Sequence, residues 1–281
     1  MEGIYSEKLN NALRTARAVG DGHHVVKWAR SIIANTKPNR DGLFVAEGIW
    51  IHKLMITSNT VVRAFIVCPE LVRTEELATL VEKVASVSAE LYTVSQKTFL
   101  KLSEREKPDG VLSIAELPKH DPAALKFNKK SVVLVLDGVE IPGNIGTMIR
   151  MADGAGVDAV AICNRKARMT HPKLIKGSQG AVLTVPFFEF DSPKQCYDWL
   201  KARGFTVYLA DTRAQHFYYD EKFGKPTALV MGSERYGISR EWYDFDYEMI
   251  AIPMLGKCDS LNVGVAATVL CYDACMKNKM K

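Results

Sequence analysis

Three loops after residue 136 carry the residue types best suited to chemistry. The first lies in DGVEIPGNIGTMIR, where Asn144 stands at the expected start of a helix and Arg150 lies further along it. An asparagine at that point can accept a hydrogen bond from a first-turn N–H, so we predict Asn144 as the N-cap. Gly146 and Thr147 precede Arg150 by four and three residues, which places all three on one helix face.

This helix face offers a cation beside a residue that has no side chain. A phosphate or a ribose could approach closely there. A second interpretation fits equally well, in which Gly146 permits tight helix packing and Arg150 is a solvated surface charge. The apolar positions of the same helix are expected to pack on a sheet; they are Ile145, Met148, Ile149 and Ala152.

The second loop lies in LVMGSERYGIS and follows an apolar run typical of a buried strand. Gly232 ends that run. Ser233 is expected to cap the next turn, and Glu234 is expected near a helix N-terminus, where a carboxylate is favourable. An ordinary capped turn also explains this loop.

The third loop lies in IPMLGKCDSLNVGVAA and leads directly into an apolar helix. We predict that Ser260 caps this helix, which would then begin at Leu261. Asn262 is a mediocre helix former in a first turn, so it is a candidate for a side-chain role. Gly264 and the alanines that follow give the helix a slim face suited to close packing, and capping with core packing is the simpler alternative.

Composition limits the classes of protein to consider. The chain has 281 residues, a formal net charge of +5, 47% hydrophobic residues and 25% charged residues. These values fit one large or two medium domains and permit a nucleic-acid partner without establishing one. No apolar run approaches the ~18 residues of a membrane span, and the mixed-charge N-terminus is not a secretory signal. We therefore expect no membrane partner.

The six cysteines are scattered and include no C-x-x-C pair. This usage predicts reduced thiols and a cytoplasmic location. Cys271 and Cys275 are four residues apart on a predicted helix, without a nearby histidine. Because a zinc site needs four convergent ligands, we expect no metal there and interpret both as partly buried helix positions.

Several common site motifs are absent from the sequence. It contains no G-x-G-x-x-G, no G-x-S-x-G and no H-E-x-x-H. Gly138 and Gly143 have the spacing of a P-loop, but Asn144 stands where that motif needs lysine. These absences argue against dinucleotide binding, an ATPase and the common hydrolases.

The elements that position the three loops fall into two predicted α/β domains. A helical arm covers residues 1–22, and an αβαβαβαβ pattern over 23–117 indicates a small first domain. Residues 118–130 are a proline- and lysine-rich linker. Residues 131–281 contain about six strands, including one expected over 181–188, that alternate with helices and should form a mostly parallel sheet. All three loops then lie at the carboxyl ends of strands, where ligands of such sheets bind.

In their order and spacing, NIGTMIR, LVMGSERYGIS and IPMLGKCDSLNVGVAA resemble the three signature motifs of the SpoU (TrmH-type) branch of the SPOUT RNA methyltransferases. The resemblance covers roughly residues 131–281. RDGLFVAEGIWIHKLM resembles the ribosomal-protein-like substrate-binding module that precedes this domain in several members. The two-domain layout is similar to ribosomal RNA 2′-O-ribose methyltransferases of the thiostrepton-resistance type. Two features depart from the family pattern. One is the N-terminal arm before His23, and the other is Gly264, which stands where the family often has serine.

The resemblance implies a deep trefoil knot that holds S-adenosylmethionine. It also implies a homodimer formed through the knotted domain, with the active site near the subunit interface. The cofactor would lie against three loops. Its expected contacts are Leu209, Ala210, Asp211, Met231, Gly232, Ser233, Glu234, Ile252, Pro253, Met254, Ser260, Leu261 and Asn262.

The resemblance further implies transfer of a methyl group from a sulfonium sulfur to a ribose 2′-hydroxyl. Arg150 corresponds to the catalytic arginine of the family, with Asn144 beside it. Because arginine stays protonated at neutral pH, we expect Arg150 to clamp the adjacent phosphate and orient the hydroxyl, while a phosphate oxygen or water takes the proton. The residues expected to position the ribose or organise the loops are Glu234, Ser260 and Asn262.

The expected substrate is structured RNA, and the first domain favours ribosomal RNA over transfer RNA. Candidate RNA contacts, each of which could equally be a solvated charge, are Arg40, Lys53, Arg105 and Lys107. Three alternatives remain: a tRNA 2′-O-methyltransferase, a knotted enzyme that methylates a base, and a non-catalytic RNA-binding relative. NIGTMIR with SLNV favours ribose over base, and the intact polar set of the three loops argues against a non-catalytic protein.

Overall fold

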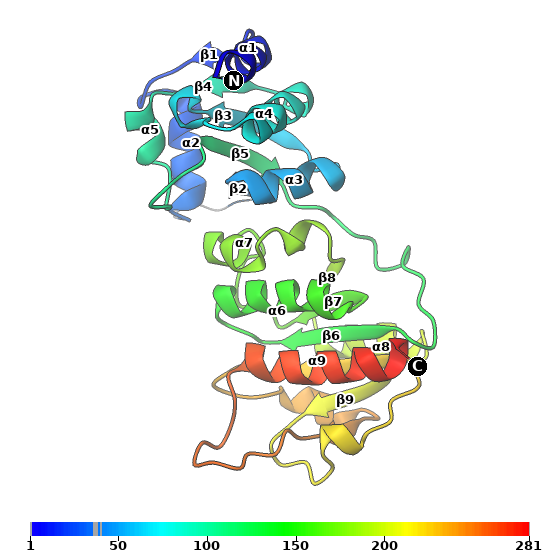
Figure 1. Ribbon diagram of the computed structural model, residues 1–281. Coiled ribbons are helices and arrows are strands. Elements are labelled where there is room, and N and C mark those ends of the chain that lie inside the picture. The colour runs from blue at the N-terminus through cyan, green and yellow to red at the C-terminus, as the bar shows by residue number, and fades with distance from the viewer. Residues whose placement is uncertain (1, 36–38, 40, 281) are drawn as a thin grey trace. The chain divides into compact units, whose positions relative to one another are not determined.

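The computed structural model describes residues 2–35, 39 and 41–280, which form two compact units (Figure 1). Residues up to 118, with 170–175, make the first unit. The rest of the chain from residue 119 makes the second. Each unit has its own sheet and its own hydrophobic core.

The first unit is built on a five-stranded mixed sheet with the order β1-β4-β3-β5-β2, in which β5 runs antiparallel to β2 and β3. Its strands are β1 (Arg17–Ala18), β2 (Leu43–Glu47), β3 (Val62–Val67), β4 (Leu91–Thr93) and β5 (Val111–Glu116). Its helices are α1 (Glu2–Ala12), α2 (His24–Ile33), α3 (Ile49–Thr57), α4 (Glu75–Val87) and α5 (Gln96–Leu100). The predicted alternation of helices and strands over 23–117 is confirmed.

Side-chain caps define where these helices begin. The Thr74 hydroxyl accepts from the Leu77 N–H at 3.2 Å, and the Ser95 hydroxyl accepts from the Thr98 N–H at 3.4 Å. Such caps satisfy backbone donors that the first helical turn leaves unpaired. The helices therefore start at polar residues that the sequence supplies directly after strands or turns.

The N-terminal arm differs from the prediction of one helix reaching about residue 20. The helix α1 ends at Ala12 and packs against α4. Arg17 and Ala18 pair in parallel with Tyr92 and Thr93 and add an edge strand to the first sheet. The prediction is wrong beyond Ala12 because pairing with β4 gives this backbone partners that a lone helical end would lack.

A fully buried histidine lies between α3 and β5. The two ring nitrogens of His52 lie 2.7 Å from the Gly48 carbonyl oxygen and 2.8 Å from the Ser113 hydroxyl. Burial lowers the pKa of His52 to about 4. The imidazole is therefore neutral in the folded chain at physiological pH.

This neutral histidine predicts a pH dependence of stability. Between about pH 4 and 6.5 the unfolded chain binds a proton at His52 that the folded chain does not, so the free energy of unfolding falls as the pH falls. The slope contributed is about 1.4 kcal/mol per pH unit. Urea unfolding of the full chain at pH 7 and pH 5 should show a shallower pH dependence for His52→Gln than for the wild type. Equal slopes would contradict the assignment.

The second unit is built on a six-stranded, wholly parallel sheet with the order β11-β9-β10-β6-β7-β8. Its strands are β6 (Val132–Asp137), β7 (Ala159–Cys163), β8 (Phe187–Phe190), β9 (Thr206–Ala210), β10 (Thr227–Met231) and β11 (Glu248–Ile250). Its helices are α6 (Pro142–Ala155), α8 (Pro193–Lys201) and α9 (Val263–Lys279), while α7 (Pro172–Ser178) is shared between the two units at residue 175. The predicted mostly parallel sheet is confirmed.

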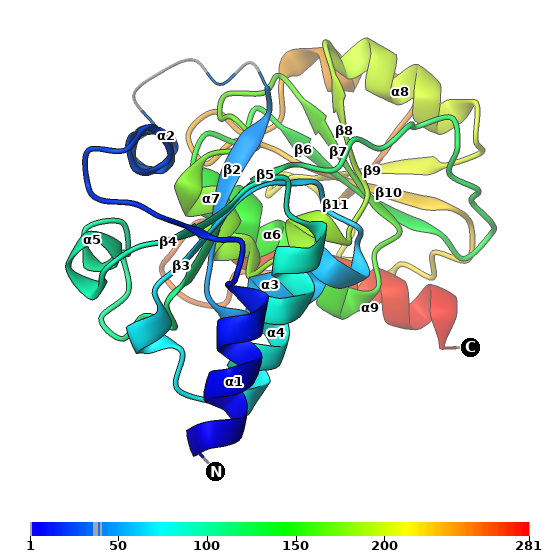
Figure 2. The same cartoon turned by 90° about the horizontal axis from the view of Figure 1, so that it is seen from above.

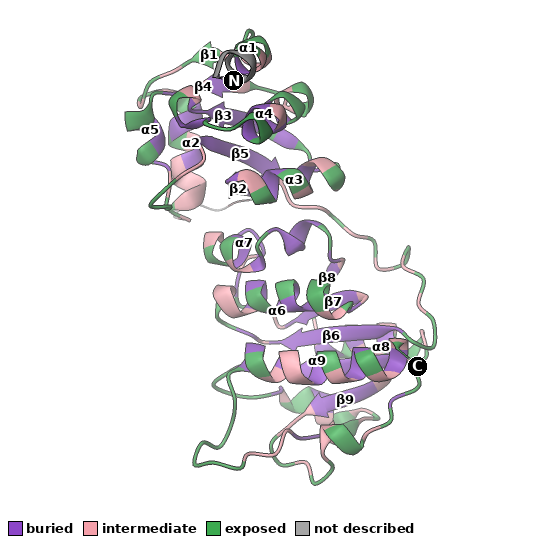
Figure 3. Ribbon diagram, in the orientation of Figure 1, coloured by how far each residue is buried: buried purple, intermediate pink, exposed green. Residues whose placement is uncertain are grey.

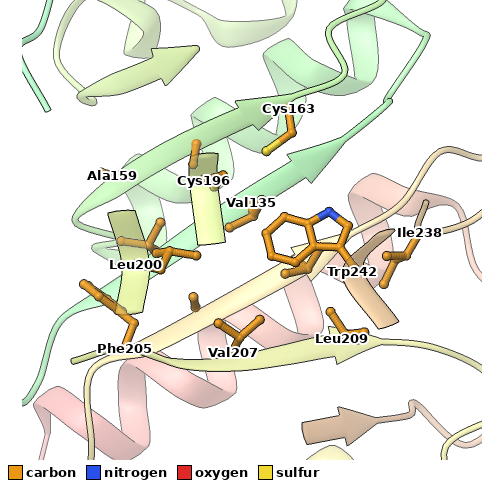
Figure 4. Packing of buried hydrophobic residues seen from close by; sticks show 14 of the residues in the cluster. Val135, Ala159, Cys163, Cys196, Leu200, Phe205, Val207, Leu209, Ile238 and Trp242 are labelled. Atoms are coloured by element: carbon orange, nitrogen blue, oxygen red, sulfur yellow. The ribbon is translucent and has the colours of Figure 1, made fainter. Parts of the chain in front are cut away.

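Helices cover both faces of this sheet. The helices α6 and α9 pack together on one face, and α8 lies on the other (Figure 2). All six residues of β6 are buried, in keeping with the continuous apolar run from Val132 (Figure 3). Val135 of this strand belongs to a cluster that includes Leu200, Phe205 and Trp242 (Figure 4). Burial on two faces explains why the strand lacks an alternating pattern.

One predicted strand of this unit begins later than expected. Residues Ala181–Leu183 form a single 3₁₀ turn, and β8 starts only at Phe187. Gly180 adopts a φ of 91°, and the Ala181 carbonyl accepts from the backbone N–H groups of Thr184 and Val185. The apolar run from Ala181 is buried in this turn. A short apolar run is therefore explained by burial alone and does not distinguish a strand from a buried turn.

The six cysteines form no disulfide, and Cys258 is the exposed one among them. Among the described residues, no helix combines the length and apolar character needed to cross a membrane.

Candidate functional site

A cavity of about 1240 Å³ lies at the carboxyl ends of β9, β10 and β11. Its wall combines the segment after β9, the turn after β10 and the loop between β11 and α9. Of the residues predicted to hold a cofactor, those that line it are Ala210, Asp211, Met231, Gly232, Ser233, Glu234, Ile252, Met254, Ser260, Leu261 and Asn262. Leu209 is fully buried behind this wall, and neither Leu209 nor Pro253 is among the lining residues.

The turn after β10 folds back tightly on the strand end. Ser233 and Gly237 exchange backbone hydrogen bonds of 2.9 and 3.0 Å, and the Ser233 hydroxyl accepts from the Tyr236 N–H at 2.9 Å. A Cβ atom on Gly232 would lie 2.1 Å from the Gly237 carbonyl carbon. Ser233 thus caps this turn as predicted. No helix follows directly, so the expected helix N-terminus at Glu234 is wrong.

Replacing Gly232 should therefore damage the cavity. We expect the added methyl group of Gly232→Ala to push the 233–237 turn away from β10. A substitution that the backbone cannot accommodate costs about 1–3 kcal/mol. Ligand binding in the cavity should therefore weaken by about tenfold or more. Calorimetric titration with S-adenosylmethionine measures this. Gly256→Ala is the matched control, because its Cβ would meet nothing within 4 Å. Wild-type affinity in Gly232→Ala would show that the turn can shift without harm.

The loop before α9 is mostly exposed and ends in a side-chain cap. The Asn262 side-chain oxygen accepts from the Gly264 N–H at 2.9 Å, and α9 begins at Val263. Ser260, predicted as the cap, instead lies exposed in the loop and donates to the Asp259 carboxylate at 3.2 Å. The prediction is wrong by two residues because Asn262 is an equally good cap that lies closer to the helix.

The helix α6 begins earlier than predicted. Ile141 is its N-cap, and Pro142 occupies the first turn, where the fixed φ of proline suits a helix start. Asn144 is therefore inside the helix, and its prediction as the N-cap is wrong. Its side-chain amide donates instead to the Glu234 carboxylate. This hydrogen bond ties the first motif to the second, as the predicted site requires.

Arg150 is exposed on α6 and does not line the cavity of its own chain. The apolar positions of α6 predicted to face the sheet are all buried: Ile145, Met148, Ile149 and Ala152. Gly146 is also buried, and a Cβ on Gly177 would lie 3.5 Å from the Gly146 Cα. Of the two interpretations of the glycine, tight packing is the one that the structure supports.

The cavity wall contains a charged cluster that was not predicted from the sequence. The Asp211 carboxylate accepts two side-chain hydrogen bonds from Arg213, at 3.0 and 2.6 Å, and one from the Tyr243 hydroxyl. Hydrogen bonding to Arg213 holds the pKa of Asp211 well below its usual range. Burial, with the adjacent carboxylate, raises the pKa of Tyr243 to about 12, so this phenol stays a donor at neutral pH.

A buried carboxylate holds the strand ends around the cavity together. Asp137, at the end of β6, accepts from the Ser239 backbone N–H at 2.7 Å and from the Asn164 side-chain amide at 2.7 Å. Ser239 lines the cavity just after the 233–237 turn. The position of Asp137 directly after an apolar strand is the sequence signal that could have identified it.

The predicted RNA contacts lie in the first unit. Lys53 pairs with Glu76, and Arg105 donates to the Glu47 carbonyl at 2.8 Å and lies 3.5 Å from the Asp109 carboxylate. Lys107 is exposed. Arg40 lies outside the described residues. In the part of the chain that the structure describes, no three histidine, cysteine, aspartate or glutamate side chains are grouped to hold a metal ion.

Comparison with known proteins matches two separate stretches of the chain to two family models. Residues 131–272 match the SpoU rRNA Methylase family, and residues 23–113 match the MRM3-like substrate binding domain. The first match spans half of the chain, and the chain belongs to the SpoU rRNA methylase family. The resemblance of the three motifs is thereby confirmed.

Curated relatives and a solved structure cover nearly the whole chain. The 23S rRNA (uridine(2479)-2'-O)-methyltransferase of Streptomyces viridochromogenes is 28% identical over 255 residues, covering 88% of each chain. RlmP of Bacillus subtilis (strain 168), a 23S rRNA (guanosine(2553)-2'-O)-methyltransferase, is 28% identical over 88% of this chain and 94% of its own. An AdoMet-bound rRNA methyltransferase from Sinorhizobium meliloti shares the fold, with a TM-score of 0.82 at 21% identity over 92% of this chain and 97% of that one.

Proposed function

We propose that this protein transfers a methyl group from S-adenosylmethionine to a ribose 2′-hydroxyl of structured RNA, with ribosomal RNA as the preferred substrate. One observation carries the proposal: a single cavity at the carboxyl end of the parallel sheet collects residues from the second and third motif loops, and Asn144 joins the first motif to it through Glu234. Family membership and the named activities of the two curated relatives support the same reaction.

The cavity fits the proposed cofactor in size and in lining. Its volume exceeds the ~300–1,000 Å³ of typical small-molecule sites, which leaves space for a nucleoside with an amino-acid tail. Apolar side chains such as Met231, Ile250 and Leu261 can contact the adenine, and backbone groups of the turn after β10 can bind polar atoms. The close approach of Gly232 to the Gly237 backbone holds this turn against the end of β10, where it forms part of the cavity wall. We infer that these loops hold S-adenosylmethionine, as the knot of the family implies.

Bound S-adenosylmethionine supplies an electrophilic methyl group on a positively charged sulfur. The protein must then present the ribose oxygen in line with that methyl group. We assign Arg150 to this task, because its planar donors can clamp a phosphate beside the target ribose. Asn144 fixes Glu234 at the edge of the cavity, and Asn262 holds the start of α9. Ser260, exposed at the cavity, can contact the incoming ribose.

A homodimer would complete this site. Three exposed side chains of α9 and one at its C-cap recur every four to seven residues along one helix face: Val265, Tyr272, Met276 and Met280. Such an apolar face on a surface helix suits a protein interface. Arg150 lies on α6, the helix that packs against α9, and could serve the cavity of a partner subunit. Light scattering of the purified chain tests the dimer.

Labelled methyl transfer to total RNA, followed by mapping of the modified nucleotide, tests the activity. Alkaline hydrolysis distinguishes the alternatives, because a 2′-O-methyl group blocks cleavage of the adjacent phosphodiester and a base methyl group does not. Label in 23S rRNA at an alkali-resistant position supports the proposal, and label in transfer RNA or on a base favours one of the other two enzymes. A chain that binds RNA but neither binds S-adenosylmethionine nor transfers a methyl group would be the non-catalytic relative.

A further inference from the structure

A tyrosine at the edge of the cavity is exposed although its backbone belongs to a tight, hydrogen-bonded turn. Tyr236 lines the cavity, yet 70% of its surface is accessible. Its backbone N–H donates to the Ser233 hydroxyl within the 233–237 turn, and Gly232 packs directly beneath that turn. The backbone of Tyr236 is therefore held in place, and its ring has little apolar packing of its own.

A cation lies over the same ring. The Arg235 guanidinium carbon is 5.1 Å from the centre of the Tyr236 ring, within the range of a cation–π contact. Aromatic rings paired with arginine are the groups that proteins use to stack single-stranded bases. The pair thus has the chemistry of a platform for a nucleobase at a site built for a nucleotide.

The position of the turn favours RNA, and not the cofactor, as the group that stacks on the Tyr236 ring. Buried residues such as Met231, Ile250 and Ala251 form the inner wall, which an enclosed cofactor would contact. Tyr236 lies on the exposed side, two residues from Glu234, whose carboxylate binds Asn144 on the helix of Arg150. A nucleotide that enters this cavity from solvent would therefore meet the exposed ring before it reaches the inner wall.

We propose that Tyr236, backed by Arg235, stacks on the base of the target nucleotide or of its direct neighbour and so holds the ribose in the cavity. The inference rests on the proposed function and names a substrate-positioning residue for it. Stacking is tolerant of base identity, so Tyr236 contributes to affinity and placement and does not read the sequence.

Steady-state methyl transfer to unmodified 23S rRNA, transcribed in vitro, tests the stacking. Tyr236→Ala should raise KM for RNA about tenfold, the effect of losing one base–aromatic stack. Tyr236→Phe should keep the wild-type KM because it keeps the ring, and Arg235→Ala should raise KM about threefold. The dissociation constant for S-adenosylmethionine should stay unchanged in all three. Tyr219→Ala is the matched control, since Tyr219 is 50% exposed in the same unit and is not among the cavity-lining residues.

The possible outcomes separate this inference from the function on which it rests. An active wild type with an unchanged KM in Tyr236→Ala would overturn the stacking alone. Weakened S-adenosylmethionine binding in that variant would assign the ring to the cofactor, and a change of oligomeric state by light scattering would assign it to an interface; either result overturns the proposal. If the wild type transfers no methyl group, its affinity for the same RNA can still be measured by fluorescence anisotropy. RNA binding that is weakened in Tyr236→Ala supports stacking, and no RNA binding by the wild type overturns both the stacking and the proposed function.

Discussion

Methyl transfer by Arg150→Ala is expected to fall about 100- to 1000-fold, the range seen when one preorganised donor is removed from a reacting centre. The affinity for S-adenosylmethionine should be nearly unchanged, because Arg150 is exposed on α6 and does not line the cavity of its own chain. Single-turnover transfer of a labelled methyl group measures the first quantity, and calorimetric titration measures the second.

Arg150→Lys is the matched control for charge. Lysine keeps the positive charge but lacks the planar fork that binds a phosphate through two donors. We expect this variant to lie between alanine and the wild type in rate. Retained turnover in Arg150→Ala, or loss of cofactor binding, would remove Arg150 from the orienting role.

Removing the first unit should separate RNA binding from cofactor binding. A chain lacking residues 1–118 is expected to bind S-adenosylmethionine like the wild type and to bind 23S rRNA about 100-fold more weakly, because two linked binding modules gain that order of avidity. Filter binding and calorimetry measure the two affinities. Residues 170–175 pack with the first unit, so circular dichroism of the shortened chain must first show that the second unit is intact.

A substitution in the full chain provides an independent check on the same role. Lys107→Glu should weaken RNA binding several-fold. The slope of log affinity against log salt concentration should also become shallower by about one, the value for one lost phosphate contact. Lys97→Glu, a change of the same charge on an exposed residue of α5, should have a smaller effect. Unchanged RNA affinity in both the shortened chain and Lys107→Glu would refute substrate delivery by the first unit.

The sheet of the second unit could be predicted because its signals are local. The run from Val132 to Leu136 is apolar without alternation, which is the pattern expected of a strand covered on both faces. The position of the cavity followed from the same reasoning, since the loops after parallel strands meet at one edge. Nearly all of the residues predicted to hold the cofactor do line that cavity.

Helix starts were predicted less well, because a good capping residue does not by itself fix where a helix begins. Pro142 starts α6 ahead of Asn144, and Asn262 caps α9 in place of Ser260. The cluster of Asp211, Arg213 and Tyr243 could not be predicted for a different reason. Tyr243 lies far along the chain from Asp211, and the two side chains meet only through the pairing of β9, β10 and β11.

The strand order of the second unit has a consequence for how the chain folds during synthesis. β6 is the first strand made, and one of its edges pairs with β10, which follows several intervening elements. Until β10 emerges, this edge of a largely apolar strand stays unpaired and prone to aggregation. The last helix, α9, packs on both β6 and β10. This strand is therefore covered only after α9 has been made, so chains truncated before β10 should aggregate, and refolding should be slow, as expected for contacts so distant in sequence.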